Sequence, residues 1–178
     1  MIFGRLATAC LLAAAAATAH AQGYPGKPIT IVVPFPPGAG VDVLTRAIGA
    51  KLSERWKQPI VFENKAGAGG VIGTAQVAKA APDGYTLLAT VNQTMVGSRF
   101  LYKKLAYDPD KSFEPPEIVD QIRSAVREVL SDRQFAEQQV TSKGLNVIAG
   151  DGKQLRDQIA GEVESTAAMI KAAGVVAE

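Results

Sequence analysis

Short apolar runs alternate with helical stripes over the first hundred residues of the chain. Residues 29–33 (Ile-Thr-Ile-Val-Val) are rich in β-branched side chains and end at a turn of prolines and glycine. Apolar residues then recur at helical spacing, at Val41, Leu44, Ile48 and Leu52. Similar strand-like runs at 60–62 and 85–90 are each followed by a loop and a helical pattern. Because strand–loop–helix units are joined by right-handed crossovers, we expect an α/β fold with a short, mostly parallel sheet flanked by helices.

The loops after the three predicted strands, at 36–42, 64–70 and 90–94, are candidates for a binding site. In a parallel sheet these loops leave at the carboxyl edge, where they can meet although they are far apart in sequence. A strand that passes through a tight loop into a helix leaves N–H groups unpaired beside the positive end of the helix dipole. Since this arrangement suits an anion, we expect the protein to hold a small anionic molecule and to do no chemistry on it.

The loop residues also have structural interpretations. Asp42 falls in the predicted first helical turn, where it can cap the helix or favour its dipole instead of contacting a ligand. Residues 67–70 (Gly-Ala-Gly-Gly) let a ligand approach the backbone, but they can equally form a turn that needs positive φ. Four polar side chains of the third loop can donate hydrogen bonds to a ligand or serve as caps: Thr90, Asn92, Gln93 and Thr94.

The second half of the chain is predicted to be mostly helical. Apolar positions between Ile118 and Val129 form one helical stripe. Asp132 and Asp151 stand where two further helices begin, and a carboxylate there can cap free N–H groups. Residues 145–149 have the pattern of a brief strand. This half contributes no loops comparable to those of the first half.

The N-terminus has the pattern of a leader. A Leu/Ala run over 6–17 follows a positively charged start, and Ala19-His20-Ala21 fits a small-residue cleavage site. The run is too short to cross a bilayer, so residues 1–21 are predicted to be a signal peptide cleaved after Ala21. A lipoprotein signal at Cys10 is the weaker alternative, because that residue lies early in the run.

Cleavage after Ala21 would remove the only Cys and the only His. The remaining chain would lack a Cys nucleophile, a His base, a Ser-His-Asp triad, disulfides and any Cys/His metal site. The full chain has a formal net charge of +2, and no basic tract indicates nucleic acid. Carboxylate acid–base chemistry stays open, but we expect no enzyme, no cofactor and no metal.

Several motifs together resemble the periplasmic solute receptors of tripartite tricarboxylate transporters, also called Bug proteins. The first is Val-Pro-Phe-Pro-Pro-Gly at 33–38, followed by Asp42. The others are residues 24–29, Glu63-Asn64, Gly-Ala-Gly-Gly at 67–70, Ala-Pro-Asp-Gly-Tyr-Thr-Leu-Leu at 81–88, Leu-Tyr-Lys-Lys-Leu-Ala-Tyr-Asp-Pro at 101–109 and Lys-Ala-Ala-Gly at 171–174.

The resemblance implies a two-lobed, Venus-flytrap-like receptor of the type II periplasmic-binding-protein kind. Such a receptor closes on a small carboxylate, with a di- or tricarboxylate favoured, and delivers it to the membrane components of a tripartite transporter. The family holds the carboxylate through backbone N–H groups and waters of the first two loops. Carried over to this chain, these residues are Pro37, Gly38, Ala39, Gly40, Val41, Asp42, Gly67, Ala68, Gly69 and Gly70.

Two departures from the family pattern matter. Ala39 and Val41 stand where many relatives have a glycine and a hydroxyl residue. The middle segment that builds the second lobe is also missing, with a junction near 114–116. The expected organisation is therefore a signal peptide at 1–21, the N-terminal part of the first lobe at 22–114, and a helical part packing on that lobe at 115–178. Without the second lobe, we expect binding to be weak and transport to be impaired.

Two alternatives stay open. A dinucleotide-binding enzyme is suggested by Gly38-Ala39-Gly40 after a strand and by Glu63 at the end of the next strand, but Val43 stands where the third glycine belongs. The other alternative is a non-transport remnant or a single-lobe carboxylate-binding module.

Overall fold

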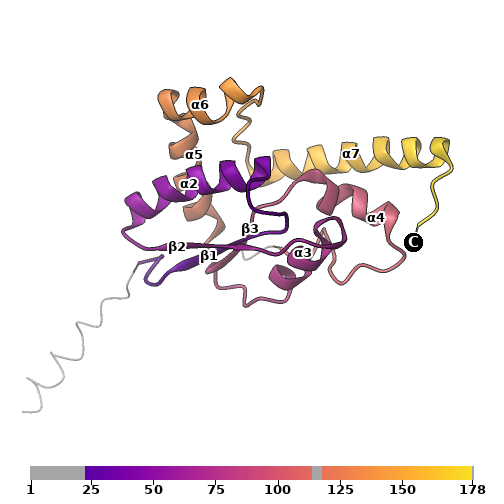
Figure 1. Ribbon diagram of the computed structural model, residues 1–178, viewed down its shortest axis with the longest axis horizontal. Coiled ribbons are helices and arrows are strands. Elements are labelled where there is room, and N and C mark those ends of the chain that lie inside the picture. Colours follow the sequence, from indigo (N-terminus) through magenta and orange to yellow (C-terminus); the bar gives the residue numbers. More distant parts are fainter. Residues whose placement is uncertain (1–22, 114–117, 178) are drawn as a thin grey trace, which may run out of the picture.

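The computed structural model describes residues 23–113 and 118–177 of the 178-residue chain. The predicted signal peptide and the predicted junction at 114–116 lie outside the described residues. The first part of the chain contains β1 (Ile29–Val33), α2 (Gly40–Trp56), β2 (Ile60–Asn64), the 3-10 turn η1 (Ala68–Gly70), α3 (Val71–Ala78), β3 (Thr86–Leu88), the π-helical turn η2 (Gln93–Gly97) and α4 (Ser98–Leu101) (Figure 1). The second part contains α5 (Val119–Ser131), α6 (Arg133–Gln139), the 3-10 turn η3 (Thr141–Lys143) and α7 (Gly152–Ala173).

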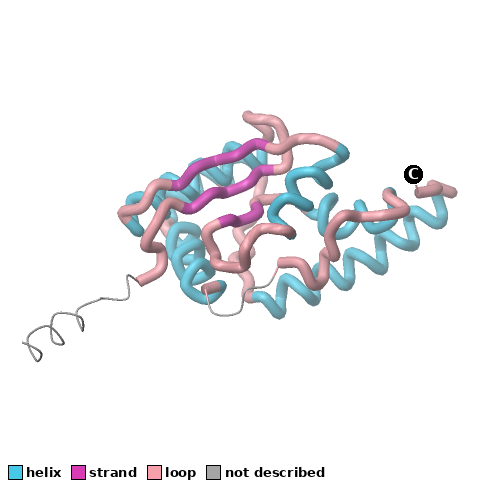
Figure 2. The backbone as a smooth tube through the Cα atoms, turned by 90° about the horizontal axis from the view of Figure 1, so that it is seen from below, coloured by secondary structure: helices cyan, strands magenta, loops and turns pink. Residues whose placement is uncertain are grey.

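Three parallel strands form the sheet in the order β2-β1-β3 (Figure 2). Ile29 of β1 pairs with Ile60 of β2, and Thr30 pairs with Thr86 of β3. Apart from Thr30, which is half-buried, the residues of the central strand are buried, as expected for a parallel strand whose two faces are both covered. The predicted α/β class, with a short parallel sheet and C-terminal helices, is confirmed.

Helices α2 and α3 cover different faces of the sheet (Figure 1). α2 packs against β2, and α3 packs against β1 and β3. The predicted apolar stripe of α2 is shifted, because Leu44 and Ile48 are only half-buried. The buried positions of this helix are Asp42, Thr45, Gly49 and Leu52. A methyl group added to Gly49 would lie 2.5 Å from Cζ of Phe62, so a side chain of β2 closely approaches the helix backbone. The burial of Asp42 and Thr45 shows that the polar start of α2 faces inward.

The C-terminal helices attach to the first part of the chain along two lines of contact. α5 packs against α2, and α7 lies against η2 and extends past the sheet (Figure 1). The predicted caps are confirmed. The Asp132 carboxylate accepts the N–H of Phe135 at 2.9 Å, and Asp151 forms a capping box with Gln154.

The prediction of a brief strand at 145–149 is wrong. This segment is irregular, and Ile148 is 71% exposed. No described strand lies beside the segment to complete a ladder, so its β-branched composition does not suffice to make a strand. Among the described residues, no helix has the length and apolar character needed to span a membrane.

Candidate functional site

The three predicted loops meet beside Gly70. This residue has φ of +95°, and a methyl group on its Cα would lie 2.6 Å from Cγ2 of Thr94 and 3.2 Å from Cζ of Phe35. Phe35 directly precedes the first loop, and Thr94 belongs to the third. The expectation that loops far apart in sequence come together at the carboxyl edge is therefore confirmed. Glycine is needed here because any side chain would push the loops apart.

A closed hydrogen-bond network joins the first loop to the start of the second. Asp42 is 2% exposed. Its carboxylate accepts hydrogen bonds from the N–H of Gly38 at 2.8 Å, from Nε of Arg46 at 3.0 Å and from Nδ2 of Asn64 at 2.9 Å. The side chain of Asn64 also donates a hydrogen bond to the carbonyl of Phe35 at 3.0 Å and accepts one from Nη2 of Arg46 at 2.8 Å. The end of β2, the first turn of α2 and the loop after β1 are thus held in one arrangement.

Electrostatics keep Asp42 ionised in this network. The hydrogen bond from Arg46, followed by those from Gly38 and Asn64, lowers the pKa of the Asp42 carboxyl to about 2, against the opposing effect of desolvation. The negative charge at the helix start is therefore paired with a guanidinium group. Asp42 was predicted as a ligand contact, as a cap or as a partner of the helix dipole; its carboxylate bonds to the loop backbone, while the N-cap position belongs to Ala39.

Some predicted backbone donors are already engaged within the first loop. The N–H of Gly38 is bound by Asp42, and the N–H of Ala39 donates to the carbonyl of Pro36 at 3.2 Å. Pro37 has no N–H to offer. These three candidates therefore shape the loop and offer no free N–H.

Six backbone N–H groups have no hydrogen-bond partner among the described residues. Three lie in the first turn of the 17-residue helix α2, and three lie in the second loop before α3. They belong to Gly40, Val41, Asp42, Gly67, Ala68 and Gly69. The remaining predicted residue of the second loop, Gly70, donates its N–H to the carbonyl of Gly67 at 2.9 Å. Such clusters of free N–H groups can bind a carboxylate without any charged side chain.

Three of the four polar side chains named in the third loop are engaged within the protein. Thr94 is fully buried, donates its hydroxyl hydrogen to the carbonyl of Val91 at 3.0 Å and lies 2.6 Å from the hydroxyl of Thr90. The side-chain amide of Asn92 donates to Glu162 of α7. Thr90, Asn92 and Thr94 therefore help to hold η2 and α7 in place, in line with their structural interpretation. Their contact with a ligand stays a prediction.

Sequence reasoning missed Arg46 and Asn64 as residues that position the loops. Arg46 lies one helical turn after Asp42, a spacing at which an ion pair is expected on a helix. Asn64 is the last residue of β2, at the carboxyl edge of the sheet. Both signals were present in the sequence, but their meeting depends on the pairing of β1 with β2.

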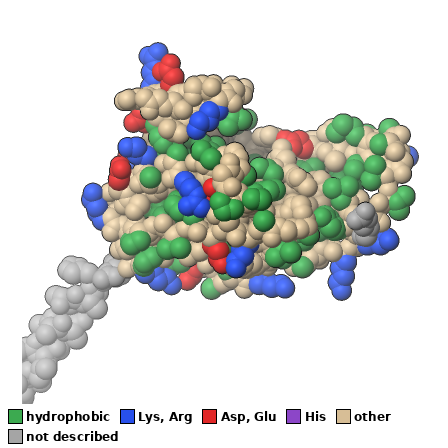
Figure 3. Space-filling view, viewed as in Figure 1, with side chains coloured by type: hydrophobic (Ala, Val, Ile, Leu, Met, Phe, Trp, Pro, Cys, Tyr) green, Lys and Arg blue, Asp and Glu red, His purple; other side chains and the backbone are tan. Residues whose placement is uncertain are grey.

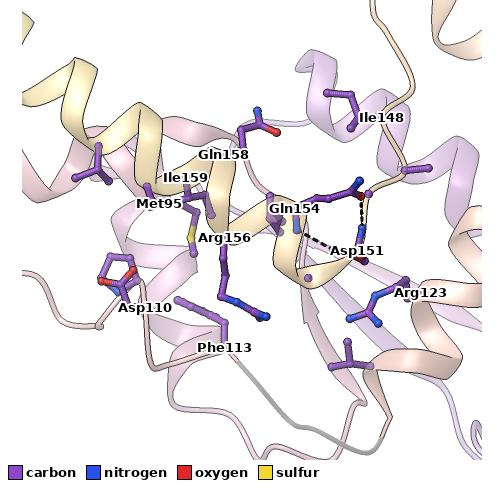
Figure 4. A pocket seen from close by; sticks show the side chains of 18 of the residues that line it. Met95, Asp110, Phe113, Arg123, Ile148, Asp151, Gln154, Arg156, Gln158 and Ile159 are labelled. Atoms are coloured by element: carbon purple, nitrogen blue, oxygen red, sulfur yellow. Dashed lines mark hydrogen bonds between the residues drawn. The ribbon is translucent and has the colours of Figure 1, made fainter.

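A separate hollow of about 1010 Å³ lies between α7, the start of α5 and η2 (Figure 4). Arg156 reaches into it from α7, and the capping box of Asp151 and Gln154 lies at one side. None of the predicted site residues lines it. Arg99 and Arg123 on its wall are paired with Asp110 and Asp120, so these two positive charges already face carboxylates. The loop cluster is therefore the better candidate site. Among the described residues, no group of three or more His, Cys, Asp or Glu side chains is placed to hold a metal ion.

Comparison with known proteins points to the same receptor class. Residues 44–115 match the family described as "Tripartite tricarboxylate transporter family receptor". Protein BugT of Bordetella pertussis is 53% identical over 73 residues, which are 41% of this chain and 22% of that protein. A UPF0065 protein from the tcbD-tcbE intergenic region of Pseudomonas sp. strain P51 is 47% identical over 95 residues, which are 53% of this chain and 28% of that protein.

Two solved structures are also similar. The periplasmic binding protein BugD is 43% identical, with a TM-score of 0.45 over 52% of this chain and 30% of that chain. MatC from Rhodopseudomonas palustris, solved with bound malate, is 35% identical, with a TM-score of 0.49 over 58% of this chain and 42% of that chain.

The resemblance to receptors of tripartite tricarboxylate transporters is confirmed by the family match, which begins within α2 and ends at Pro115. The chain spans about a quarter of the length of the two curated relatives named above. The match covers the second loop and the third loop, while the first loop precedes it.

Proposed function

We propose that this protein is a periplasmic solute-binding receptor that holds a small carboxylate, with a di- or tricarboxylate favoured, at the loop cluster. The proposal is carried by the six unpaired N–H groups of Gly40–Asp42 and Gly67–Gly69, which lie in the two loops of a chain that matches this receptor family. A carboxylate at the start of α2 would also be stabilised by the helix dipole. Membrane components of a tripartite transporter would be its partners.

The pairing of Asp42 with Arg46 supports this function. An unpaired carboxylate in the first turn of α2 would repel an anionic ligand at the same place. Arg46 neutralises that charge at 3.0 Å, so the N–H groups of the helix start can bind an anion. Asp42 and Arg46 therefore act on the ligand indirectly, through the loop that they hold.

We further propose that the chain forms a single lobe and binds weakly. Residues 1–21 would be removed on export, 22–114 and 115–178 would form the lobe, and the junction at 114–116 would replace the second lobe of the relatives. Hydrogen bonds to a charged group contribute about 1.5–3 kcal/mol each, so losing a second set of contacts would lower affinity by orders of magnitude. A non-transport remnant or a one-lobe carboxylate-binding module shares this chemistry and would differ in having no transporter partner.

The test uses Gly40, the first residue of α2. Proline is tolerated at this helix position, and the preceding Ala39 has φ of −59° and ψ of 152°, as a residue before proline prefers. Gly40→Pro therefore removes one candidate donor without disturbing the helix, and Gly40→Ala keeps that donor. No atom lies within 4 Å of an added methyl group at this position.

NMR titration of the ¹⁵N-labelled protein with succinate and citrate, at up to millimolar concentrations, gives the affinity of each variant. We expect the Gly40→Ala variant to bind like the wild type and the Gly40→Pro variant to bind at least about tenfold more weakly. Shifts should centre on the amides of the two loops. Binding that is equal in both variants, or shifts centred on the hollow beside α7, would contradict the proposed site.

A further inference from the structure

Two polar side chains converge on the second loop at Gly69: Gln93, which the sequence offered as a hydrogen-bond donor or a cap, and Tyr102, which it did not single out. A methyl group added to this residue would lie 2.8 Å from Nε2 of Gln93 and 3.4 Å from Oη of Tyr102. Gln93 begins η2, and Tyr102 directly follows α4. The two side chains therefore come from different turns of the chain and reach the same point of the loop.

Neither side chain has a hydrogen-bond partner for these atoms among the described residues. The other polar side chains around the loops differ in this respect, because Thr94, Asn92 and Asn64 all bond within the protein. The N–H of Gly69 is unpaired as well. An amide N–H, a phenolic O–H and a backbone N–H are thus free to donate at one place, and the oxygens of a ligand can accept from all three.

The second loop lies in contact with both flanking segments. A methyl group added to Gly70 would meet Phe35 on the side of the first loop and Thr94 on the side of η2. A ligand that reaches from the start of α2 to Gln93 and Tyr102 must therefore pass along this glycine-rich loop. Such a ligand needs one oxygen-bearing group at each end.

We propose that Gln93 and Tyr102 hold the second carboxylate of a dicarboxylate whose first carboxylate binds the N–H groups at the start of α2. This inference rests on the proposed function and assigns it a specificity determinant. Both side chains are uncharged, so they select by hydrogen bonding. A monocarboxylate of the same length would leave their donors unused, and a site built to bind an oxygen discriminates against an analogue that lacks it.

Succinate and butyrate separate the two ends of the ligand, because both have four carbons and only succinate has the second carboxylate. NMR titrations would compare the wild type with the Gln93→Met and Tyr102→Phe variants, which keep the size of each side chain. We expect each variant to bind succinate about tenfold or more weakly and to bind butyrate within twofold of the wild type. Tyr85→Phe is the matched control, because Tyr85 precedes β3 at the opposite edge of the sheet and its hydroxyl accepts the N–H of Gly26.

The ratio of the two affinities decides the proposal, because a change in the shape of the loop would weaken both acids together. Equal losses for succinate and butyrate, or no loss in either variant, would overturn the assignment of Gln93 and Tyr102 while leaving the proposed function in place. A wild type that binds neither acid would overturn both. Malonate, glutarate and adipate then measure the span between the two ends of the site.

Discussion

The two halves of the molecule are built differently, and the candidate site belongs to the half with the deeper core. In the first half, β1 contributes Ile29, Val32 and Val33 without any exposed surface, and Leu52 of α2 is 2% exposed. In the second half, α7 buries no residue, and Leu155 and Met169 are more than half exposed. Hydrophobic side chains are visible on the surface along α7 (Figure 3). A binding loop needs a backbone that is fixed before the ligand arrives, and the sheet half supplies one.

A pair of leucine substitutions gives the largest test of this difference. Leu52→Ala should lower the free energy of unfolding by about 2–5 kcal/mol, because it leaves a cavity in the packed interior. Leu155→Ala, at a side chain that is 56% exposed, should cost about 1 kcal/mol or less. Urea unfolding followed by circular dichroism measures both values. Similar losses for the two variants would show that α7 is as much a part of the core as α2.

The sheet and the meeting of its loops could be predicted from the sequence. Three β-branched runs, each followed by a loop and a helix, allow few arrangements other than a parallel sheet, and a parallel sheet brings its loops to one edge. The caps Asp132 and Asp151 were also predictable, because a cap and the N–H group it binds lie within three residues. Local rules therefore sufficed for the frame of the site.

The donors within that frame could not be predicted in the same way. Whether the N–H of Gly38 is free depends on the Asp42 side chain, and Asp42 is held by Asn64 from another strand. The convergence of Gln93 and Tyr102 depends on the π-helical turn η2, whose wider hydrogen-bonded ring changes the direction of the side chains that follow. A sequence pattern with 3.6 residues per turn does not predict this change in side-chain direction.

An acid titration compares the two halves through one carboxylate in each. The pKa of Asp42 in the folded protein is lowered to about 2, below its ordinary value of 3.8. Its contribution to stability is therefore complete above about pH 4 and is lost as the pH falls from 4 towards 2. Asp42→Asn should be less stable than the wild type at pH 7, and this deficit should shrink over the same acid range.

Unfolding midpoints measured between pH 2 and pH 7 test this expectation. Asp157→Asn is the matched control in the second half, because Asp157 is exposed on α7 and its ion-pair partner among the described residues is Lys153 alone. We expect that control to follow the wild type at every pH. A constant difference between Asp42→Asn and the wild type across the whole range would show that the carboxylate does not hold the loops through its charge.

The last pair of expected effects has opposite signs in the two halves and comes from one kind of substitution, glycine to alanine. Gly70→Ala places a methyl group 2.6 Å from Thr94 at φ of +95° and should cost about 1–3 kcal/mol. Gly161 lies inside α7, and no atom lies within 4 Å of a methyl group added there. Gly161→Ala should therefore stabilise the protein by about 0.5–1 kcal/mol, because alanine lowers the conformational entropy of the unfolded chain. Thermal unfolding resolves both changes. If Gly70→Ala were neutral, the three loops would not be in close contact, and the basis for a common binding site would be lost; if Gly161→Ala were destabilising, α7 would be packed against a surface where it has none here.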